Sequence, residues 1–414
     1  MMDLAAELLF YGITGIIIYV YAGYPLMLAI FGIFKRRALP RGETRLPSVA
    51  LIISAHNEDR IIREKIENSL KLDYPRNLLR IIVASDGSVD RTNNIVRDYE
   101  GYNISLKTFE KREGKSATLN KAILGVEEEI VVFSDANAFY REDALLKLVR
   151  HFADEEVGCA VGRLIYLDSE SYVGRGESLY WRYEGLLNRL ESRMKSVLVA
   201  TGTIFAIRRS LFRPVIRDVA NDFQTPAEIA SQGYGVVYDG EAVAYERSSY
   251  FFTEEFNRKR RIIVRGLTGF NHLKGDFGGS FRIYQFVSRK LLRWWIGALL
   301  PVLYVANVFL LGDPVFYAFF LMQNAFYIFA MVGAVLRRGR VRSRIFFIPF
   351  YFVMVNTAAL AAILTYMTGG RLSSWEKAET TRDMDENYLE TPVLRVIEGN
   401  KKAPESLENL NKIT

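Results

Sequence analysis

The chain has 414 residues and a formal net charge of +7, and 50% of its residues are hydrophobic while 24% are charged. The single cysteine, Cys159, excludes a disulfide framework within the chain, and three histidines argue against a zinc site built from His and Cys ligands. Any bound metal is therefore expected to be a hard cation held by carboxylates.

Four stretches without charged residues exclude a purely soluble protein, because each is about as long as the ~20 residues that a membrane span requires. They cover residues 8–34, 294–312, 314–336 and 345–370. The intervening residues 35–293 have the composition of a globular domain, which excludes a pure transporter. The positive charge gathers beside the apolar stretches and not on a face with interleaved aromatic residues, so no nucleic-acid partner is expected.

The first apolar stretch predicts an N-terminal transmembrane anchor within residues 1–36. It is too long for the apolar region of a signal peptide, and it has no basic leading segment and no clear small-residue cleavage site; a signal peptide is the alternative. The basic residues that follow are Lys35, Arg36, Arg37, Arg41 and Arg45. The positive-inside rule then places the N-terminus outside and the next domain in the cytoplasm.

Short apolar strands alternate with helical segments after the anchor, which predicts a cytoplasmic α/β domain over residues 46–270. Strands are expected at residues 49–53, 79–84 and 130–133, and helices near residues 60–70, 90–98 and 116–126. This alternation is typical of a Rossmann-like, mixed and mainly parallel sheet covered by helices on both faces. Ligands of such sheets bind beyond the carboxyl ends of the strands.

Polar side chains follow three of these strands. The three segments are Ala55-His56-Asn57-Glu58, Ser85-Asp86-Gly87-Ser88 and Ser134-Asp135-Ala136-Asn137. A carboxylate and an amide two positions apart, such as Asp135 and Asn137, can jointly hold a divalent cation that binds a diphosphate. The alternative is that these residues only cap the following helices. Three carboxylate-bearing strand ends in one domain favour the binding site.

The C-terminal third predicts membrane elements. Residues 280–293 place apolar and basic side chains on different helical faces, which predicts an amphipathic interface helix; a cytoplasmic extension of the next span is the alternative. Residues 294–370 predict three transmembrane helices, and Arg337–Arg344 between the last two are expected in the cytoplasm. Pro349 leaves the topology of the last helix open, and residues 371–414 form a polar tail.

Five motifs, in this order between about Val49 and Gly266, resemble those of membrane-bound family 2 glycosyltransferases with a GT-A fold. Besides the three strand-end segments, they are Lys115-Ser116-Ala117-Thr118-Leu119-Asn120 and the pair Gly202-Thr203 with Arg208-Arg209. The resemblance implies that a nucleotide sugar is bound by Ala55, Asn57, Glu58, Asp86, Gly87, Ser88, Lys115, Asp135 and Ala136. It further implies a Mg²⁺ or Mn²⁺ at Asp135 and Asn137, and an acceptor side at Gly202 and Thr203.

Three departures from the family pattern bear on function. The D-x-D motif is Asp-Ala-Asn here, and the neutral Asn137 is expected to weaken cation binding. The acidic T-E-D motif is Ala-Asn-Asp, so the general base of the family falls on Asp222, for which a helix N-cap is the alternative. At the Q-x-x-R-W motif, Ile262 or Ile263 replaces the tryptophan that stacks on the acceptor sugar of processive synthases.

The basic cluster at this last motif is expected to bind the leaving diphosphate through Arg260 and Arg261, with a membrane-facing basic patch as the alternative. The resemblance implies an inverting hexosyltransferase that moves one sugar from a UDP- or GDP-sugar to a lipid-linked glycan or polysaccharide. The expected location is a bacterial or archaeal plasma membrane. The alternatives are a processive polysaccharide synthase and exporter, or an inactive nucleotide-sugar-binding subunit. The oligomeric state stays open.

Overall fold

The computed structural model describes residues 2–33, 45–167, 172–247, 251–273, 277–336 and 343–370. The basic runs at residues 35–41 and 337–342, on which the predicted topology depends, and the polar tail 371–414 lie outside these described residues.

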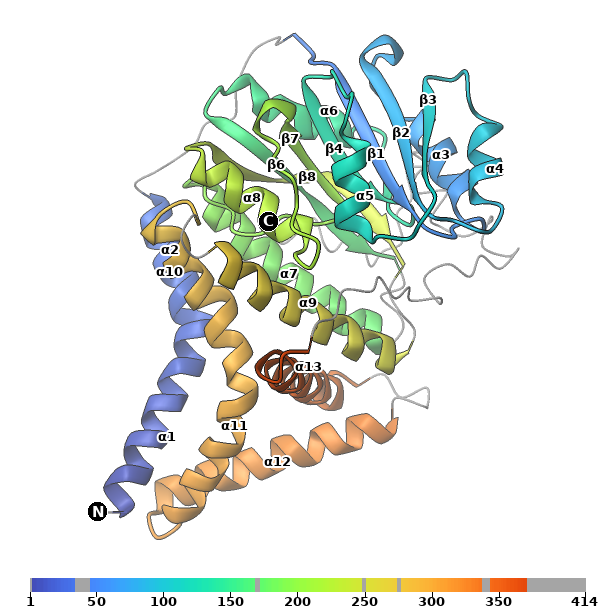
Figure 1. Cartoon of the computed structure of the whole chain (residues 1–414). Helices are drawn as coiled ribbons and strands as arrows, with labels where there is room; N and C mark the ends of the chain where they lie inside the picture. Colours follow the sequence, from blue (N-terminus) through green and yellow to red (C-terminus); the bar gives the residue numbers. More distant parts are fainter. Residues whose placement is uncertain are drawn as a thin grey trace.

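One eight-stranded sheet, in the order β3-β2-β1-β4-β7-β6-β8-β5, organises the α/β domain (Figure 1). The strands are β1 (Val49–Ala55), β2 (Leu79–Asp86), β3 (Ile104–Phe109), β4 (Ile130–Asp135), β5 (Phe139–Tyr140), β6 (Val157–Tyr166), β7 (Ile204–Arg208) and β8 (Gly235–Glu246). Strand β7 runs antiparallel to β4 and β6, and β5 runs antiparallel to β8, whereas the other neighbours are parallel. The expected mixed and mainly parallel sheet is confirmed.

Both faces of the sheet are covered, and the central strands carry mostly apolar residues. All seven residues of β1 are buried. Leu51 and Ile53 join one apolar core and Ala50 and Ile52 the other, as alternate side chains of a strand point to opposite faces. The domain helices are α3 (Ile62–Leu70), α4 (Thr92–Arg97), α5 (Lys115–Ala122), α6 (Ala144–Val149), α7 (Tyr172–Ser192), α8 (Asn221–Ser231) and α9 (Phe252–Leu273), with short 3-10 turns at Arg76–Leu78, Arg150–Ala153 and Arg209–Leu211.

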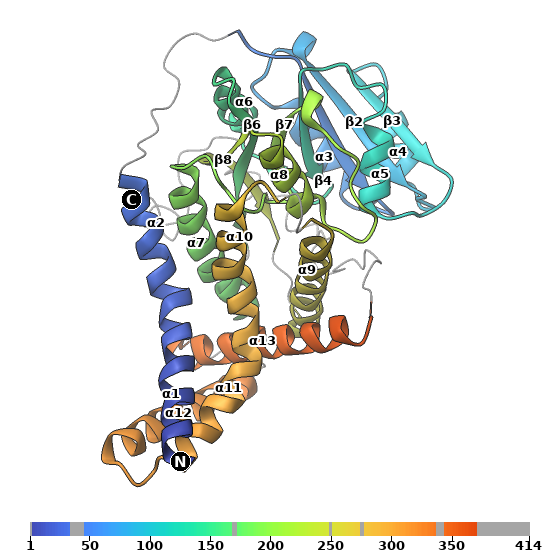
Figure 2. The same cartoon turned by 60° about the vertical axis from the view of Figure 1, so that its left-hand side comes forward.

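Four helices of the described chain are long and apolar enough to cross a membrane, at Asp3–Ile33, Ser280–Phe309, Pro314–Leu336 and Arg344–Met367. The first joins α1 (Met2–Ile18) and α2 (Tyr24–Ile33) through a π-helical turn at Tyr19–Gly23. The second joins α10 (Ser280–Phe286) and α11 (Leu292–Phe309) through a π-helical turn at Val287–Leu291. The third and fourth are α12 and α13. Figures 1 and 2 together show α13 lying crosswise to α1 and α11, between α9 and α12.

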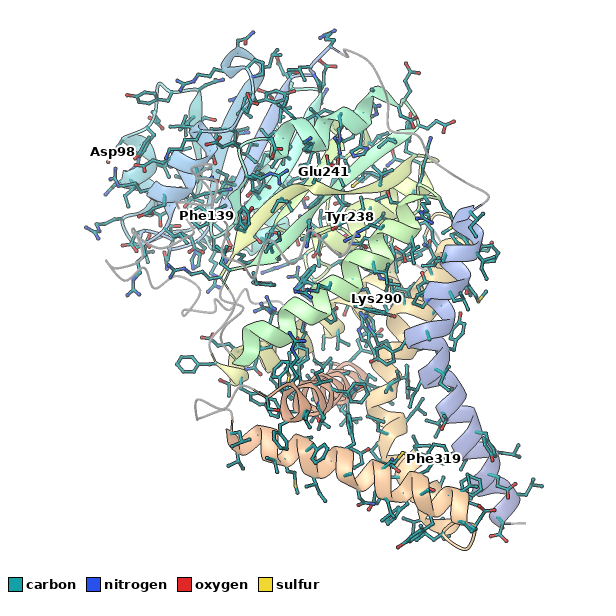
Figure 3. All side chains as sticks on the ribbon, turned by 180° about the vertical axis from the view of Figure 1, so that it is seen from behind. Asp98, Phe139, Tyr238, Glu241, Lys290 and Phe319 are labelled. Atoms are coloured by element: carbon teal, nitrogen blue, oxygen red, sulfur yellow. The ribbon has the colours of Figure 1, made fainter. Side chains whose placement is uncertain are left out.

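The segment expected to be a separate interface helix continues without a break into α11. Its arginines are buried against the domain: Arg282 donates to the backbone oxygens of Val197 and Leu198 at 3.1 and 3.2 Å. In the view from behind, Lys290 lies where the domain meets the membrane helices, far from Phe319 on α12 (Figure 3). This segment therefore fastens the domain to the bundle.

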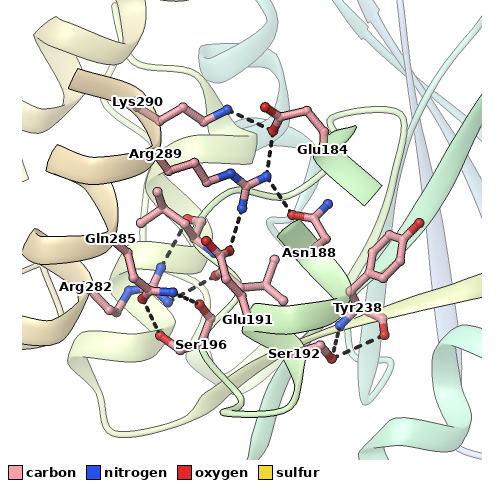
Figure 4. Close-up of polar contacts among 12 residues, drawn as sticks. Glu184, Asn188, Glu191, Ser192, Ser196, Tyr238, Arg282, Gln285, Arg289 and Lys290 are labelled. Atoms are coloured by element: carbon pink, nitrogen blue, oxygen red, sulfur yellow. Dashed lines mark hydrogen bonds and ion pairs between the residues drawn. The ribbon is translucent and has the colours of Figure 1, made fainter. Parts of the chain in front are cut away.

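Glu191 on α7 is the centre of that junction. Its fully buried carboxylate accepts hydrogen bonds from Tyr24 Oη at 2.7 Å, from the Leu198 backbone N–H at 3.0 Å and from Arg289 Nη1 at 2.5 Å. Figure 4 shows the contact with Arg289. One carboxylate thus joins α2, α7 and the π-helical turn before α11, and removing its charge leaves part of the Arg289 charge uncompensated.

We expect Glu191→Gln to destabilise the protein by roughly 3 kcal/mol, since breaking a buried ion pair leaves its partner charge unpaired. The measurement is the thermal unfolding midpoint of the full chain in detergent. The matched control is Glu156→Gln, whose carboxylate is 79% exposed and pairs with Lys195 on the surface; it should leave the midpoint unchanged. Equal midpoints for both variants would contradict this role of Glu191.

Candidate active site

A cavity of about 830 Å³ lies between the carboxyl edge of the sheet and α13. Its sheet end is lined by Lys115, Asp135, Asn137, Gly202, Thr203, Asp222 and Glu246. Its membrane end is lined by Tyr21 and by residues of α7, α9, α11 and α13. One cavity therefore connects the polar strand ends to the membrane helices.

The strand order explains why residues far apart in sequence meet there. Asp135 ends β4 and Glu246 ends β8. Strands β4 and β6 both run antiparallel to β7, and β8 runs parallel to β6. Strands β4 and β8 therefore run in the same direction and end at the same edge of the sheet. Strand β7 begins where β4 ends, so Gly202 and Thr203 just before it reach the same edge. Asp222 follows in the first turn of α8.

Asp135 is held from two sides. Its Oδ1 accepts a hydrogen bond from Ser54 Oγ at 3.1 Å and forms an ion pair with Lys115 Nζ. Lys115 Nζ also lies 3.4 Å from the backbone oxygen of Gly202. The ammonium group therefore links the Asp-Ala-Asn segment to the predicted acceptor side.

Asp222 needs the glycine at position 202. A Cβ atom on Gly202 would lie 3.0 Å from Asp222 Oδ2, which is tighter than ordinary contact. Burial raises the pKa of the Asp222 carboxyl above its usual value, while the nearby charges of Lys115 and Arg265 act in the opposite direction. A carboxylate with a raised pKa, facing a cavity, suits proton abstraction. The N-cap residue of α8 is Ala220 and no side-chain hydrogen bond caps the helix, so the structure does not support the capping alternative for Asp222.

Thr203 adds a hydroxyl to this wall. Its side chain is 7% exposed, and among the described residues its Oγ1 has no hydrogen-bond partner. The backbone oxygen of Thr203 accepts from Tyr140 Oη at 2.8 Å, which fixes the residue against the core. A buried and unsatisfied hydroxyl costs free energy unless a ligand or water completes it.

Asn137 and Glu246 lie beside Asp135 in the cavity wall. Asn137 Nδ2 donates to Glu246 Oε1 at 2.8 Å. Within the described ranges, no three His, Cys, Asp or Glu side chains come together as a ready cation site. Two carboxylates and an amide oxygen are nevertheless the ligands that Mg²⁺ and Mn²⁺ prefer, so the donor set fits once the Asn137 amide presents its oxygen.

The predicted nucleotide residues after β1 and β2 are brought together beside this cavity. Asn57 N donates to Ser88 Oγ at 3.0 Å, and Asn57 Oδ1 accepts from the Val89 N–H at 2.8 Å. The Asp86 carboxylate accepts the backbone N–H groups of residues 113 and 114, both at 2.8 Å, so it anchors the loop before α5. Gly87 has φ +61° and would clash with Arg112 if it carried a Cβ. Ala55, Asn57, Glu58, Asp86, Gly87, Ser88 and Ala136 do not line the cavity itself.

The two arginines predicted for the diphosphate separate on α9. Arg261 lines the cavity, as does Arg258. Arg260 instead donates to Thr365 Oγ1 on α13, from Nε at 3.1 Å and from Nη2 at 2.8 Å. The structure therefore brings only Arg261 of this pair to the site.

Sequence reasoning missed several residues that line the cavity. Glu246 is the last residue of a strand, as Asp135 is, and a carboxylate at a strand end is the signal that singled out Asp135. Arg265 lies four positions from Arg261 on α9 and donates to the Val219 backbone oxygen at 2.9 Å. Lys290, Arg293 and Glu184 also line the cavity, and nothing in their local sequence indicates that they do.

Comparison with known proteins identifies the family to which the chain belongs. Residues 50–216 match the model of the family described as "Glycosyl transferase family 2". The probable glycosyltransferase YdaM of Bacillus subtilis is 25% identical over 351 residues, which cover 78% of this chain and 82% of YdaM. An N-acetylglucosaminyltransferase of Bradyrhizobium elkanii is 31% identical over 126 residues, which cover 29% of this chain and 68% of the relative.

Among solved structures, the mannosyltransferase PcManGT of Pyrobaculum calidifontis, in complex with GDP-Man and Mn²⁺, shares the fold with a TM-score of 0.67 at 21% identity. The match covers 89% of this chain and 99% of PcManGT. The expected GT-A fold with accompanying apolar helices is confirmed. The chain belongs to the family 2 glycosyltransferases and is a hexosyltransferase of the GT-A fold.

Proposed function

We propose that the enzyme transfers a single hexosyl unit, with inversion, from a UDP- or GDP-sugar to a membrane-associated lipid-linked glycan or polysaccharide. The observation that carries this proposal is the placement of Asp222. Its carboxylate faces Gly202 in a cavity that also holds the Lys115–Asp135 pair and that opens toward the membrane helices. A base, a diphosphate-binding end and a membrane end thus share one space.

In the proposed reaction, Asp222 accepts the proton of an acceptor hydroxyl placed beside Gly202 and Thr203. The hydroxyl oxygen forms a bond to the anomeric carbon as the bond from that carbon to the diphosphate breaks, and the electron pair leaves with the diphosphate. Lys115, Arg261 and Arg265 are the cations placed to stabilise the departing charge. A Mg²⁺ or Mn²⁺ bound by Asp135, Asn137 and Glu246 would neutralise part of the diphosphate charge.

The nucleotide is proposed to bind beside the cavity, at the ends of β1 and β2. The hydrogen bonds of Asn57 and Asp86 shape that edge and support this placement. We keep the expected layout as part of the proposal: an anchor over residues 1–36, a cytoplasmic domain over 46–270, an interface segment over 280–293, spans over 294–370 and a polar tail over 371–414, in a bacterial or archaeal plasma membrane.

A processive synthase is the second candidate, and Trp294 is the observation that favours it. The Trp294 ring from α11 packs on Gly266, where a Cβ atom would lie 2.6 Å from it, and Trp294 lines the cavity. An aromatic side chain thus lies close to the motif from which the family tryptophan is missing, and aromatic faces can stack on sugars.

The experiment that tests the proposal incubates the purified full chain with UDP- and GDP-hexoses, Mn²⁺ and a membrane extract. The products are analysed by mass spectrometry. A mass increase of one hexose supports single transfer, a ladder of added hexoses supports the processive synthase, and the absence of transfer and of donor hydrolysis with every donor would indicate an inactive subunit.

Gly202→Ala is expected to lower kcat by about 10²-fold while donor binding stays within about twofold. The added methyl group pushes the Asp222 carboxylate from its place, and a small misplacement of a reacting group is costly. Steady-state kinetics and a donor-binding titration check this. The control is Gly240→Ala, whose Cβ would meet only the Tyr238 ring at ordinary contact distances of 3.5 Å or more. Unchanged kcat in Gly202→Ala would remove the steric argument for this site.

A further inference from the structure

Three basic side chains surround one carboxylate at the membrane end of the cavity. Glu184 on α7 lies 2.6 Å from Arg289 Nη2, 3.1 Å from Lys290 Nζ and 2.6 Å from Arg293 Nη2 (Figure 4 shows the first two). We call Arg289, Lys290 and Arg293 the junction cations. Arg289 is also bound to Glu191 and to Asn188 Oδ1 at 2.8 Å.

The junction cations carry more charge than their partners neutralise. Three positive groups face the two carboxylates Glu184 and Glu191, and their side chains are at most 12% exposed. Across the cavity, Arg258 and Lys259 both pair with Glu255. Among the described residues, the lining holds nine Lys and Arg side chains and four carboxylates, and Glu191 and Glu255 pair with three of these cations from outside the lining. Because buried unpaired charge is costly, an anionic ligand would be stabilised here.

Two groups of cations serve different parts of this cavity. Lys115 contacts Asp135 at the sheet edge, where the donor diphosphate is proposed to lie. The junction cations come from the membrane-side helix, beside Tyr180, whose ring lies 5.4 Å from the Arg293 guanidinium carbon. The junction cations and Asp222 line the same cavity.

The cavity floor next to the junction cations is apolar. Ile348, Phe352, Val355 and Ala359 line it from one face of α13, at helical spacings of four, three and four residues. Tyr21 packs on Phe352 with ring centroids 6.2 Å apart, and the Ile348 side chain is 45% exposed. We call these four α13 residues the apolar stripe. It continues from the cavity to the surface of a helix apolar enough to lie in lipid.

We propose that the acceptor is an anionic lipid, whose phosphate binds Lys290 and Arg293 and whose hydrocarbon chain lies along the apolar stripe. This inference rests on the proposed function, because it names the class of acceptor for the same site. The junction cations and the apolar stripe lie side by side, which suits a lipid that carries a phosphate. A neutral glycolipid would leave the excess positive charge of the junction cations uncompensated.

The first test needs no variant. The full chain in a neutral detergent, without donor, is titrated with farnesyl phosphate, farnesol and inorganic phosphate, and binding is followed by calorimetry. Farnesyl phosphate should bind at least about tenfold more tightly than either of the others, because only it engages both surfaces. Equal binding of farnesol overturns the role of the cations, and equal binding of inorganic phosphate overturns the role of the stripe.

The second test uses Lys290→Gln and Arg293→Gln, which should each weaken farnesyl phosphate binding about tenfold and leave donor binding unchanged. Glu184→Gln should keep or tighten farnesyl phosphate binding, since removing this carboxylate increases the net positive charge of the junction cations and their partners. The control is Arg189→Gln, an exposed residue on α7 outside the cavity. If Lys290→Gln and Arg293→Gln instead lose donor binding, these two cations bind the donor and the inference fails. If sugar transfer occurs without any preference for the phosphate, only this inference fails, not the proposed function.

Discussion

Asp222→Asn is expected to lower kcat by at least about 10³-fold while donor binding stays within about twofold. General base catalysis contributes up to ~10⁴-fold, and an amide of the same shape cannot accept the proton. Among the described residues, no basic side chain forms an ion pair with the Asp222 carboxylate, although the charges of Lys115 and Arg265 lower its pKa, so its neutral replacement leaves the cavity wall intact. Steady-state transfer kinetics and calorimetric titration with the donor check the two parts of this result.

Asp98→Asn is a suitable control, because that carboxylate is 67% exposed at the end of α4 and pairs only loosely with Arg63 at 3.7 Å. It should retain full activity. Full activity of Asp222→Asn would show that Asp222 is not the base. Equal loss of kcat and donor binding would place its role in the donor site.

The pH dependence of kcat follows from the same residue. A base works in its deprotonated form, and burial raises the pKa of Asp222. Activity should therefore begin to fall at a pH above the usual range of aspartate as the solution is made more acidic, since Asp222 then takes up its proton. The acidic limb of the kcat profile measures this pKa, and it should disappear from the residual activity of Asp222→Asn.

The sequence allowed the strands and apolar helices to be predicted because both depend on local pattern. The runs at residues 49–53, 79–84 and 130–133 lie within β1, β2 and β4, and each charge-free stretch forms a helix. Motif order then placed Asp135 and Asp222 in one domain. The reversed direction of β7, which brings Gly202 to Asp135, depends on long-range strand pairing that no local pattern encodes.

The junction between domain and membrane could not be predicted for a related reason. The periodicity of the sequence shows that Arg282 and Arg289 lie in a helical region with apolar residues. It does not show whether the basic face of that helix contacts lipid or another part of the protein. Lipid headgroups and buried carboxylates satisfy an arginine equally well. In the structure Arg289 pairs with Glu184 and Glu191 on α7, about a hundred residues earlier in the chain, and Arg282 donates to the backbone oxygens of residues 197 and 198.

Asp135→Asn is expected to lower kcat/KM by about 10²-fold or more in saturating Mn²⁺, and chelation with EDTA should abolish the activity of the unaltered enzyme. Asp135 is the carboxylate that Ser54 and Lys115 hold at the end of β4, and an amide removes its charge without changing its shape. Transfer assays over a range of Mn²⁺ concentrations measure both effects. Full activity of Asp135→Asn, or undiminished activity of the unaltered enzyme in EDTA, would contradict a metal role.

Asn137→Asp adds a carboxylate where Asp135→Asn removes one, and it tests the same proposed cation ligands, Asp135, Asn137 and Glu246. It restores the family D-x-D pattern and places a second carboxylate 2.8 Å or so from Glu246, where Asn137 Nδ2 now donates. Two like charges at this separation repel unless a cation lies between them. The variant should therefore need about tenfold less Mn²⁺ for half-maximal activity, and it should bind Mn²⁺ more tightly in a titration without donor. If its Mn²⁺ requirement is unchanged while Asp135→Asn is impaired, the Asp135 carboxylate acts through Lys115 and not through a cation shared with Asn137 and Glu246.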